Sequence, residues 1–418
     1  MFRLTFPLLS IALIVACGCD GINATSDPAG LATIIDSTAD TIFAQTDGDV
    51  APSTLRTLVS TLSIAPGPED TLLFSEIREL AVDDQRRMWV YDPRLKQLFL
   101  FSPTGTLVKR IGRGGSGPGE FARSSGMVVY GGNGVALWDS QNSRISFIDG
   151  NGSYTHSWPT PGGFSTTAGL VTDLTGTLFI KRPVTPPRDG EILGRMGLVR
   201  LKEGGAFADS SVAPDLRVPR EPYVARTKDA QSSTSARYAA SYHWAWHPEG
   251  YFLAADGGKY EIVLARKHAK PVVIRRTSSP VPVTDEEREV ERAEITYQLR
   301  TTDPGWLWSG PALPIEKAPV MGLRVARDGR IWVRVAQASE VIPLAERSVS
   351  EDSLAPVRRH RTPAVYEVFE PSGRFLGRVA FPPRAGFGQA VGDEVWAVVL
   401  GSDDMPAVTR FKVTPGFR

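Results

Sequence analysis

Short apolar segments alternate with polar turns along the chain from about residue 33 to its last residues. Most of these segments are too short for globular helices, and they are rich in Val, Ile, Leu, Phe, Tyr and Trp. Apolar runs of this kind, bounded by Gly, Pro, Asn, Asp and Ser, are typical of β-strands joined by tight turns. The pattern therefore predicts an all-β fold.

The predicted strands form a repeat. Residues 80–108 contain four of them, and residues 127–155 show the same order at an offset of 47 positions. Four further units follow, beginning near residues 170, 244, 323 and 389. Four-stranded units of roughly 44 residues are typical of the blades of a β-propeller, so we expect six blades. The third unit is weakly marked, and rings of five or seven blades stay open as alternatives.

The sixth unit ends after its third strand, so another part of the chain has to complete it. Propellers commonly close when an N-terminal strand joins the last blade, and residues 58–64 form an apolar strand just before the first unit. Residues 33–35 and 41–43 are expected to form a small hairpin packed outside this strand. We therefore assign residues 33–418 to one propeller, closed by N-terminal strands near 33–64.

Two motifs in the first two units resemble a known repeat. Residues 112–121 read Gly-Arg-Gly-Gly-Ser-Gly-Pro-Gly-Glu-Phe, and residues 139–145 read Asp-Ser-Gln-Asn-Ser-Arg-Ile. Together they resemble the NHL repeat, and the whole chain is similar to the six-bladed β-propeller lipoproteins of Gemmatimonadota- and Bacteroidota-like bacteria, a mostly uncharacterised group. NHL propellers bind proteins, RNA or small ligands, and a minority are enzymes. The resemblance therefore implies the fold far more than the function.

Composition narrows the classes of function. The hydrophobic content is 42% and the formal net charge is +1, values that disfavour both disorder and an electrostatic grip on nucleic acid. The 40 Gly and 32 Pro residues suit a fold with many tight turns. No nucleic-acid partner is expected, and a monomer is the expected state.

The first sixteen residues form a segment of a different kind. An apolar run of about 13 residues extends from Leu4 to Ala16, which is too short to span a membrane and suits the core of a signal peptide. Its end, Ile14 to Cys17, resembles the lipobox of bacterial lipoproteins, in which the cysteine is lipidated. Cys17 is the better candidate, Cys19 is the alternative, and no cysteine follows. We expect a lipoprotein signal at 1–16, a tether at 17–32 and a lipid anchor in the cell envelope, in either membrane leaflet, with an ordinary cleaved signal as the alternative.

The lengths of the connections distinguish the two faces of the predicted ring. Within each blade the strands are called a to d from the axis outward; the a–b and c–d turns lie on one face, and the b–c and d–a connections lie on the other. The first set is short throughout, and we call that side the bare face. The second set carries four long insertions, which define the loop-rich face: 183–196, 213–241, 276–320 and 337–363. Long loops on a rigid scaffold commonly carry binding function, so the loop-rich face is the predicted site, and simple coverage of the channel mouth is the alternative.

The insertions contain one predicted helix and two groups of candidate binding residues. Residues 284–287 form a capping box that opens a helix to about Leu299, with Val290, Ala293 and Tyr297 on an apolar side facing the propeller. Trp306 and Trp308 follow in a Gly- and Pro-rich loop. These aromatic rings could grip a sugar or a peptide, or pack against the base of their own loop.

A cluster of basic residues lies in the last insertion. Arg358, Arg359 and Arg361 surround His360 and could receive an anionic group, although a short charged run is more commonly only solvated. We keep the three arginines as candidate ligand-binding residues.

An enzyme would need a site in the axial channel. Gluconolactonase-like propellers hold a divalent metal there with Glu, Asn and Asp, whereas the inner strands of this chain are mostly apolar. Glu79 and His243 are the polar residues at their loop-rich ends, and two candidates do not make a metal site. A Ca²⁺ ion in the channel has no motif to support it, so no metal ligands, no cofactor and no catalytic residues are assigned.

These observations favour a binding or scaffold module of the cell envelope. We expect it to hold a protein or peptide ligand on the loop-rich face. A metal-dependent hydrolase or lyase with its site in the channel and a carbohydrate binder are the alternatives.

Overall fold

The structure is a computed structural model that describes residues 23–26, 31–65, 74–160, 169–187, 194–217, 220–347 and 354–417. The predicted signal peptide, Cys17 and Cys19 lie outside the described residues. None of the described helices has the length and apolar character needed to cross a membrane.

Six four-stranded antiparallel blades follow one another in the order expected from the repeats. Three N-terminal strands extend the fourth blade to a seven-stranded sheet, and a parallel contact joins the fifth and sixth blades into one eight-stranded sheet. The strands of the first three blades, given from the axis outward, are β5 (Glu79–Val82), β6 (Met88–Asp92), β7 (Gln97–Phe101) and β8 (Leu107–Ile111); β9 (Ser124–Tyr130), β10 (Gly134–Asp139), β11 (Arg144–Ile148) and β12 (Tyr154–Pro159); β13 (Gly169–Thr172), β14 (Leu178–Pro183), β15 (Met196–Leu201) and β16 (Phe207–Val212).

The other three blades complete the ring, since the inner strand of the last one lies next to β5. Their strands are β19 (His243–His247), β20 (Tyr251–Ala255), β21 (Glu261–Ala265) and β22 (Val272–Thr277); β23 (Val320–Val325), β24 (Ile331–Val335), β27 (Val365–Phe369) and β28 (Phe375–Ala380); β29 (Ala385–Val391), β30 (Glu394–Leu400), β31 (Pro406–Thr414) and β4 (Arg56–Ile64).

The buried run at the start of the second strand of each blade is apolar on both of its sides because each side faces a neighbouring blade. In β6, Trp89 packs toward blade two and Val90 packs toward blade six, and both side chains are fully buried. Trp332 of blade five and Trp396 of blade six occupy the same strand position and are also fully buried. Continuous apolar runs in these strands therefore mark burial on two faces.

The N-terminal segments join two different blades. β4 pairs antiparallel with β31, with Leu58 opposite Val413, and it thus supplies the outer strand of blade six. The hairpin of β2 (Ala32–Ser37) and β3 (Ile42–Asp47) lies elsewhere than expected, because β3 pairs in parallel with β22 of blade four. β1 (Asn23–Ser26) extends this sheet beyond β2. The sequence pattern shows the hairpin but not the blade edge that receives it.

A turn of blade five explains why the hairpin docks where it does. Ala44 in β3 is fully buried, and a Cβ added to Gly373 would lie 2.3 Å from the Ala44 side chain. Gly373 also has a φ of +91°, which side-chain-bearing residues rarely adopt. The glycine turn of blade five therefore leaves room for β3 at the edge of blade four.

The motifs at residues 112–121 and 139–145 stabilise a connection between blades one and two. Asn142 donates to the carbonyl oxygen of Gly115 at 2.9 Å and to Asp139 at 2.7 Å. Arg144 donates to the carbonyl oxygens of Ser116 at 2.8 Å and Gly117 at 2.7 Å. The two side chains thus hold the glycine-rich loop, whose backbone accepts these bonds, between blades one and two.

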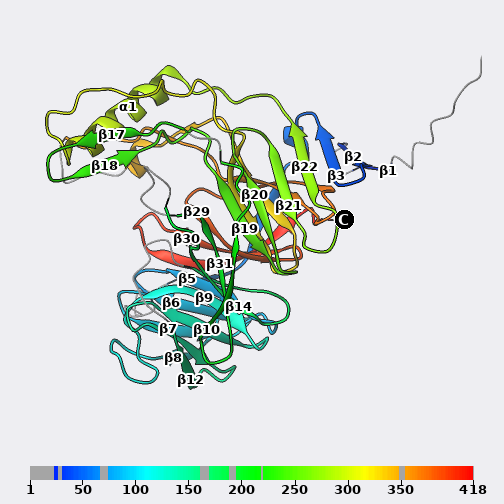
Figure 1. Ribbon diagram of the computed structural model, residues 1–418, viewed down its shortest axis with the longest axis vertical. Helices are drawn as coiled ribbons and strands as arrows, with labels where there is room; N and C mark the ends of the chain where they lie inside the picture. Colours follow the sequence, from blue (N-terminus) through cyan, green and yellow to red (C-terminus); the bar gives the residue numbers. More distant parts are fainter. Residues whose placement is uncertain are drawn as a thin grey trace, which may run out of the picture.

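Three insertions assemble into one small structure on the loop-rich face, which we call the cap. Figure 1 shows its main elements gathered on one side of the molecule, away from β1 to β3. The cap comprises β17 (Tyr223–Arg226), β18 (Gln231–Thr234), α1 (Asp285–Arg300), β25 (Glu340–Val341) and β26 (His360–Arg361). Its own apolar core includes Tyr223, Ile295, Leu299, Trp306 and Leu313. The insertions are therefore folded together and do not hang as separate loops.

The inserted helix begins where the sequence predicts, but it buries another side. Thr284 and Glu287 form the capping box, and α1 extends to Arg300. Its buried residues are Glu287, Glu291, Ile295 and Leu299, whereas Ala293 of the predicted apolar side is exposed. The prediction was wrong because two buried glutamates are satisfied by partners in other segments: Lys317 Nζ at 2.8 Å and the Arg237 amide at 2.7 Å.

Candidate functional site

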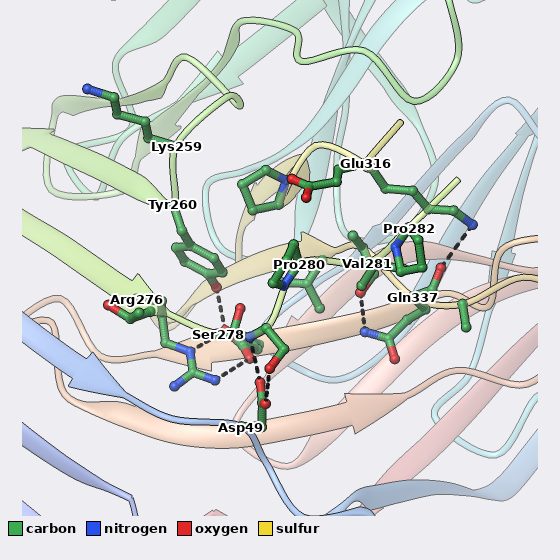
Figure 2. Close-up of a pocket in the computed structure, with 18 of the residues that line it drawn as sticks. Asp49, Lys259, Tyr260, Arg276, Ser278, Pro280, Val281, Pro282, Glu316 and Gln337 are labelled. Atoms are coloured by element: carbon green, nitrogen blue, oxygen red, sulfur yellow. Dashed lines mark hydrogen bonds and ion pairs between the residues drawn. The ribbon is translucent and has the colours of Figure 1, made fainter. Parts of the chain in front are cut away.

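A pocket with a volume of about 630 Å³ opens among connections of blades four and five (Figure 2). The four connections of blades four and five that line it are b–c or d–a connections, so it belongs to the loop-rich face. They are residues 258–260 before β21, 276–282 from the end of β22 onward, 316–319 before β23 and 335–338 from the end of β24 onward. Asp49, Glu367 and Arg378 complete the lining.

The floor of the pocket is a buried carboxylate that accepts several hydrogen bonds. Arg276 at the end of β22 donates to both oxygens of Glu367, each at 2.9 Å. Tyr260 donates to Oε2 at 2.6 Å, and Arg378 in β28 donates to Oε1 at 2.6 Å. Figure 2 shows Tyr260 and Arg276 converging on this point from separate segments of blade four. The floor is therefore built by three strands and one turn, and its geometry is fixed.

Charge at the floor is unbalanced. Two guanidinium groups share one carboxylate, and the side chains of Arg276 and Glu367 are 0% and 1% exposed. Burial alone would raise the pKa of Glu367, but the positive charges of Arg276 and Arg378 hold it below its usual value. Burial and the Glu367 charge together raise the pKa of Tyr260 well above its usual value. Glu367 is therefore a carboxylate at neutral pH, and one positive charge remains in excess.

That excess charge is accessible from the pocket through Arg378. Its side chain is 17% exposed, while that of Arg276 is fully covered. Asp49 stands at the edge of the same pocket, where hydrogen bonds from Ser279 lower its pKa and the two arginines add a smaller effect. Since Asp49 is exposed, it screens the floor only partly.

One wall of the pocket, formed by the segments around residues 281 and 316, is continuous with the cap. The Lys317 amide donates to the Val281 carbonyl at 2.8 Å, which pairs the segments around 281 and 316. Lys317 Nζ then reaches Glu287 of α1 at 2.8 Å and Ser339 at 2.7 Å. Burial alone would raise the pKa of Glu287, but these contacts lower it to about 2. The cap thus fixes one wall of the pocket through a buried ion pair.

The rim carries prolines and two exposed charges. Pro280, Pro282 and Pro319 present apolar rings without an N–H donor. Lys259 and Glu316 are exposed, and Lys259 extends away from the floor in Figure 2. The pocket therefore combines an apolar wall, a cationic floor and a mixed-charge rim.

The two candidate tryptophans pack within the cap. Trp306 is 5% exposed, and its Nε1 donates to the Val224 carbonyl at 2.9 Å. The Trp308 ring lies 4.8 Å from the Tyr223 ring and 4.2 Å from the Arg292 guanidinium. Of the two interpretations open for these residues, the structure supports packing against the base of their own loop.

The basic cluster is paired with acidic residues. Arg358 forms an ion pair with Glu294 of α1 at 2.8 Å, and Arg361 pairs with Glu346 at 2.6 Å. Arg359 lies 3.9 Å from Glu286. The contacts of Arg358 and Arg359 join the last insertion to the helix, and that of Arg361 lies within the insertion, so the three arginines link parts of the cap.

Glu79 and His243 are the first residues of the inner strands β5 and β19. Glu79 accepts a long hydrogen bond of 3.5 Å from Ser124, and burial raises its pKa to about 7. His243 lies 3.1 Å from the Ser241 hydroxyl, and burial lowers its pKa. Within the described ranges, no three His, Cys, Asp or Glu side chains are grouped to hold a metal ion.

The raised pKa of Glu79 predicts a measurable pH dependence. A carboxyl group whose folded pKa lies above its unfolded pKa favours the fold at low pH, and this contribution is lost as the pH rises to about 7. Glu79→Gln should therefore increase the free energy of unfolding at pH 8 by on the order of 2 kcal/mol, with little change at pH 4. Urea unfolding at both pH values measures this difference. An equal effect of the substitution at pH 4 and pH 8 would show that burial does not perturb this carboxyl.

The opposite end of the channel is lined by apolar residues together with charged ones, among them Asp84, Asp173 and Arg327. A cavity of about 710 Å³ opens on the bare face between the inner strands. Its lining includes Leu80, Met127, Leu170 and Val325. The Gln389 side chain also lines this cavity, and its Oε1 accepts a hydrogen bond of 2.8 Å from the Val82 amide.

The repeat at the start of the ring matches a described family. Residues 67–155 match the sequence profile of a family described as 6-bladed beta-propeller, and this region covers blade one and nearly all of blade two. The structure adds four further blades and a closed circle of sheets. The chain is a six-bladed β-propeller.

Solved structures similar to this propeller share little sequence with it. A protein of Bacteroides fragilis described as exported has 13% identity and a TM-score of 0.45, covering 90% of this chain and 99% of its own. A member of the DUF4221 family from Bacteroides vulgatus has 10% identity and a TM-score of 0.48, covering 86% and 99%. A gluconolactonase from Xanthomonas campestris has 14% identity and a TM-score of 0.39, covering 85% and 89%. No curated protein matches the sequence.

The residues that form the floor of the pocket were not predicted from the sequence. Glu367 is a lone charge inside the apolar strand Val365–Phe369, and Arg276 stands near the end of another apolar strand. A charged residue at a buried strand position needs a partner, which is a signal that could have been used. The partner itself could not be identified, because Arg276 in β22 and Glu367 in β27 are far apart in the sequence.

Proposed function

We propose that this propeller is a binding module of the cell envelope that holds a protein or peptide partner in the pocket of Figure 2. The observation that carries the proposal is the accessible, fixed cationic floor of a pocket on the face that bears the long insertions. Rigid, preformed sites lose little entropy on binding, and this floor is held in place by Glu367 before any ligand arrives.

The pocket suits an extended segment of the partner that carries a carboxylate. A volume of about 630 Å³ accommodates a few amino-acid residues, and the proline-rich wall offers apolar contact. The carboxylate, from an acidic side chain or a chain terminus, would reach Arg378 and offset the excess charge of the floor. Lys259 at the rim would assist the approach of an acidic segment.

Capture from envelope extracts tests this proposal. The wild-type protein should retain a partner, and Lys259→Glu should bind that partner at least tenfold more weakly. The substitution reverses the charge at the rim and leaves the residues of the floor unchanged. Lys202→Glu is the matched control, since Lys202 is an exposed lysine in a bare-face turn. Equal capture by all three proteins would contradict the proposal.

We further propose that the propeller is exported and tethered to a membrane through Cys17, with Cys19 as the alternative acceptor. The support is the lipobox-like tetrad Ile14 to Cys17 and the lack of any cysteine after position 19. Labelling of cells with a palmitate analogue should mark the wild type and Cys19→Ser but not Cys17→Ser. If Cys17→Ser retained the label and Cys19→Ser lost it, the lipidated residue would be Cys19. Absence of label on the wild type would refute the tether.

A further inference from the structure

Residues of all six blades line the cavity on the bare face. Its apolar lining comes from the inner strands and includes Leu80, Met127, Leu170, Trp246 and Val325. Its volume of about 710 Å³ lies within the range of small-molecule sites. The cavity shares no lining residue with the pocket of Figure 2, so the two sites can be tested separately.

One carboxylate in this lining has no cationic partner. The charged residues of the lining are Asp84, Asp173 and Arg327. Arg327 forms an ion pair with Asp84, so these two charges offset each other. Asp173 forms no ion pair within the part of the chain that the structure describes. The lining therefore has one negative charge in excess.

The turn that holds Asp173 has a close counterpart in blade one. Asp83 occupies the matching place there, at the end of the inner strand. Oδ1 of Asp83 accepts from the Arg87 amide at 3.0 Å, and Oδ1 of Asp173 accepts from the Thr177 amide at 3.1 Å. In both turns, one carboxylate oxygen thus stabilises the turn itself.

The second carboxylate oxygen is used in blade one and unused in blade three. Oδ2 of the fully buried blade-one aspartate accepts from Arg87 Nε at 2.8 Å and from Trp89 Nε1 at 3.1 Å. Blade three lacks both donors, since the matching residues are Thr177 and Phe179. Oδ2 of Asp173 therefore accepts no hydrogen bond from the described residues, and this side chain, which is only half-buried, lines the cavity.

An aromatic ring stands beside the unused oxygen. A Cβ at Gly250 would lie 4.0 Å from Asp173 Oδ2 and 3.9 Å from Trp246 Cζ2. Since glycine has no side chain, the carboxylate oxygen and the edge of the indole ring border the same open space. The Phe179 ring packs against the indole, with the ring centres 5.0 Å apart. A carboxylate next to aromatic rings favours an ammonium group.

We propose that the bare-face cavity binds a small amphipathic cation, an ammonium group on an apolar body. The ammonium group donates to Oδ2 of Asp173 beside Trp246 and offsets the excess negative charge. The apolar body lies against the inner strands, where Leu170 and Val325 line the cavity. The site differs from the pocket of Figure 2 in face, in charge and in ligand, so either proposal can fail alone.

Calorimetric titration with two probes tests the site. Hexylammonium chloride and 1-hexanol have the same apolar chain, and only the first carries a charge. Neither is an anion, so neither is a probe of the cationic pocket of Figure 2. At pH 7 and fixed ionic strength, we expect saturable binding of hexylammonium and at least tenfold weaker binding of hexanol. Equal affinities for the two probes, or no saturable binding of hexylammonium, would overturn the proposal.

Two aspartate variants distinguish ligand binding from stabilisation of the turn. Asp173→Asn should weaken binding of hexylammonium at least tenfold and leave binding of hexanol unchanged. Asp149→Asn is the matched control, because Asp149 in a bare-face turn of blade two accepts from two backbone amides in the same way and does not line the cavity. The control should bind hexylammonium as the wild type does, and the two variants should change Tm by similar amounts. Equal affinity of both variants for hexylammonium would contradict the role of Asp173.

A third variant keeps the carboxylate and supplies the partner that blade three lacks. Thr177→Arg places a guanidinium group at the position that Arg87 occupies in blade one, where it donates to the aspartate Oδ2. We expect this variant to bind hexylammonium at least tenfold more weakly than the wild type, with a Tm that is no lower. Wild-type affinity in a folded Thr177→Arg variant would show that Oδ2 of Asp173 does not receive the ammonium group.

Discussion

Deletion of β4 is expected to abolish the cooperative unfolding of the propeller. This strand completes blade six by pairing along β31, and its Ile64 is buried in the core between blades six and one. A variant beginning at residue 66 leaves blade six with an unpaired edge and exposes the apolar residues beneath β4. We expect this variant to aggregate or to unfold without a sharp transition in urea, followed by tryptophan fluorescence.

A shorter deletion gives the control for this experiment. A variant beginning at Ala51 keeps β4 and loses the strands added to blade four together with Asp49 and Val50, so it should retain a single transition at lower urea. If the variant beginning at residue 66 unfolded as sharply as the one beginning at Ala51, β4 would not be the strand that closes the ring.

Substitution of Glu367 by Gln should cost about 3–5 kcal/mol in the free energy of unfolding, the range found when one partner of a buried ion pair is removed. The amide keeps the shape of the side chain but leaves Arg276, fully buried, without a compensating charge. Urea unfolding at pH 7 measures the loss. Glu370→Gln is the matched control, because Glu370 pairs with Arg374 in a more exposed turn and should change stability by less than about 1 kcal/mol.

The deficit of Glu367→Gln should depend on pH in a defined direction. The folded pKa of Glu367 lies below its usual value, so its contribution is present above the unfolded pKa of about 4.3 and is lost as the pH falls through the folded value. The difference between wild type and variant should therefore be largest near neutral pH and shrink toward pH 3. A difference that is constant from pH 7 to pH 3 would show that the charge of Glu367 is not what stabilises the floor.

The sequence predicted the parts of the fold that depend on local pattern. Each of these parts is encoded by a single stretch of chain. They are the strand lengths, the repeat interval, the apolar strand at 58–64 and the capping box at Thr284. Placement of the N-terminal hairpin was not predictable, because it depends on Ala44 meeting Gly373 across more than 300 residues. The buried face of α1 was missed for a similar reason: Glu287 is buried only because Lys317 neutralises it.

The candidate site was predicted as a face but not as a set of residues. Counting connection lengths located the loop-rich face, because loop length is a property of the sequence alone. The exposed-looking candidates, Trp306 and Arg358, instead hold the cap together. The pocket floor combines Arg276, Glu367 and Arg378 from three strands, and only the folded ring brings their charges into contact.

Site-specific crosslinking in cells tests the central claim most directly. A photo-reactive benzoylphenylalanine is placed at Glu316, an exposed position at the rim of the pocket, and at Asn151, an exposed position in a bare-face turn. We predict that irradiation yields one discrete adduct from position 316, mapped to an acidic or chain-terminal segment of a partner, that Lys259→Glu removes it, and that position 151 yields none. Equal crosslinking from both positions, or none from position 316, would contradict the assignment of the pocket as the binding site.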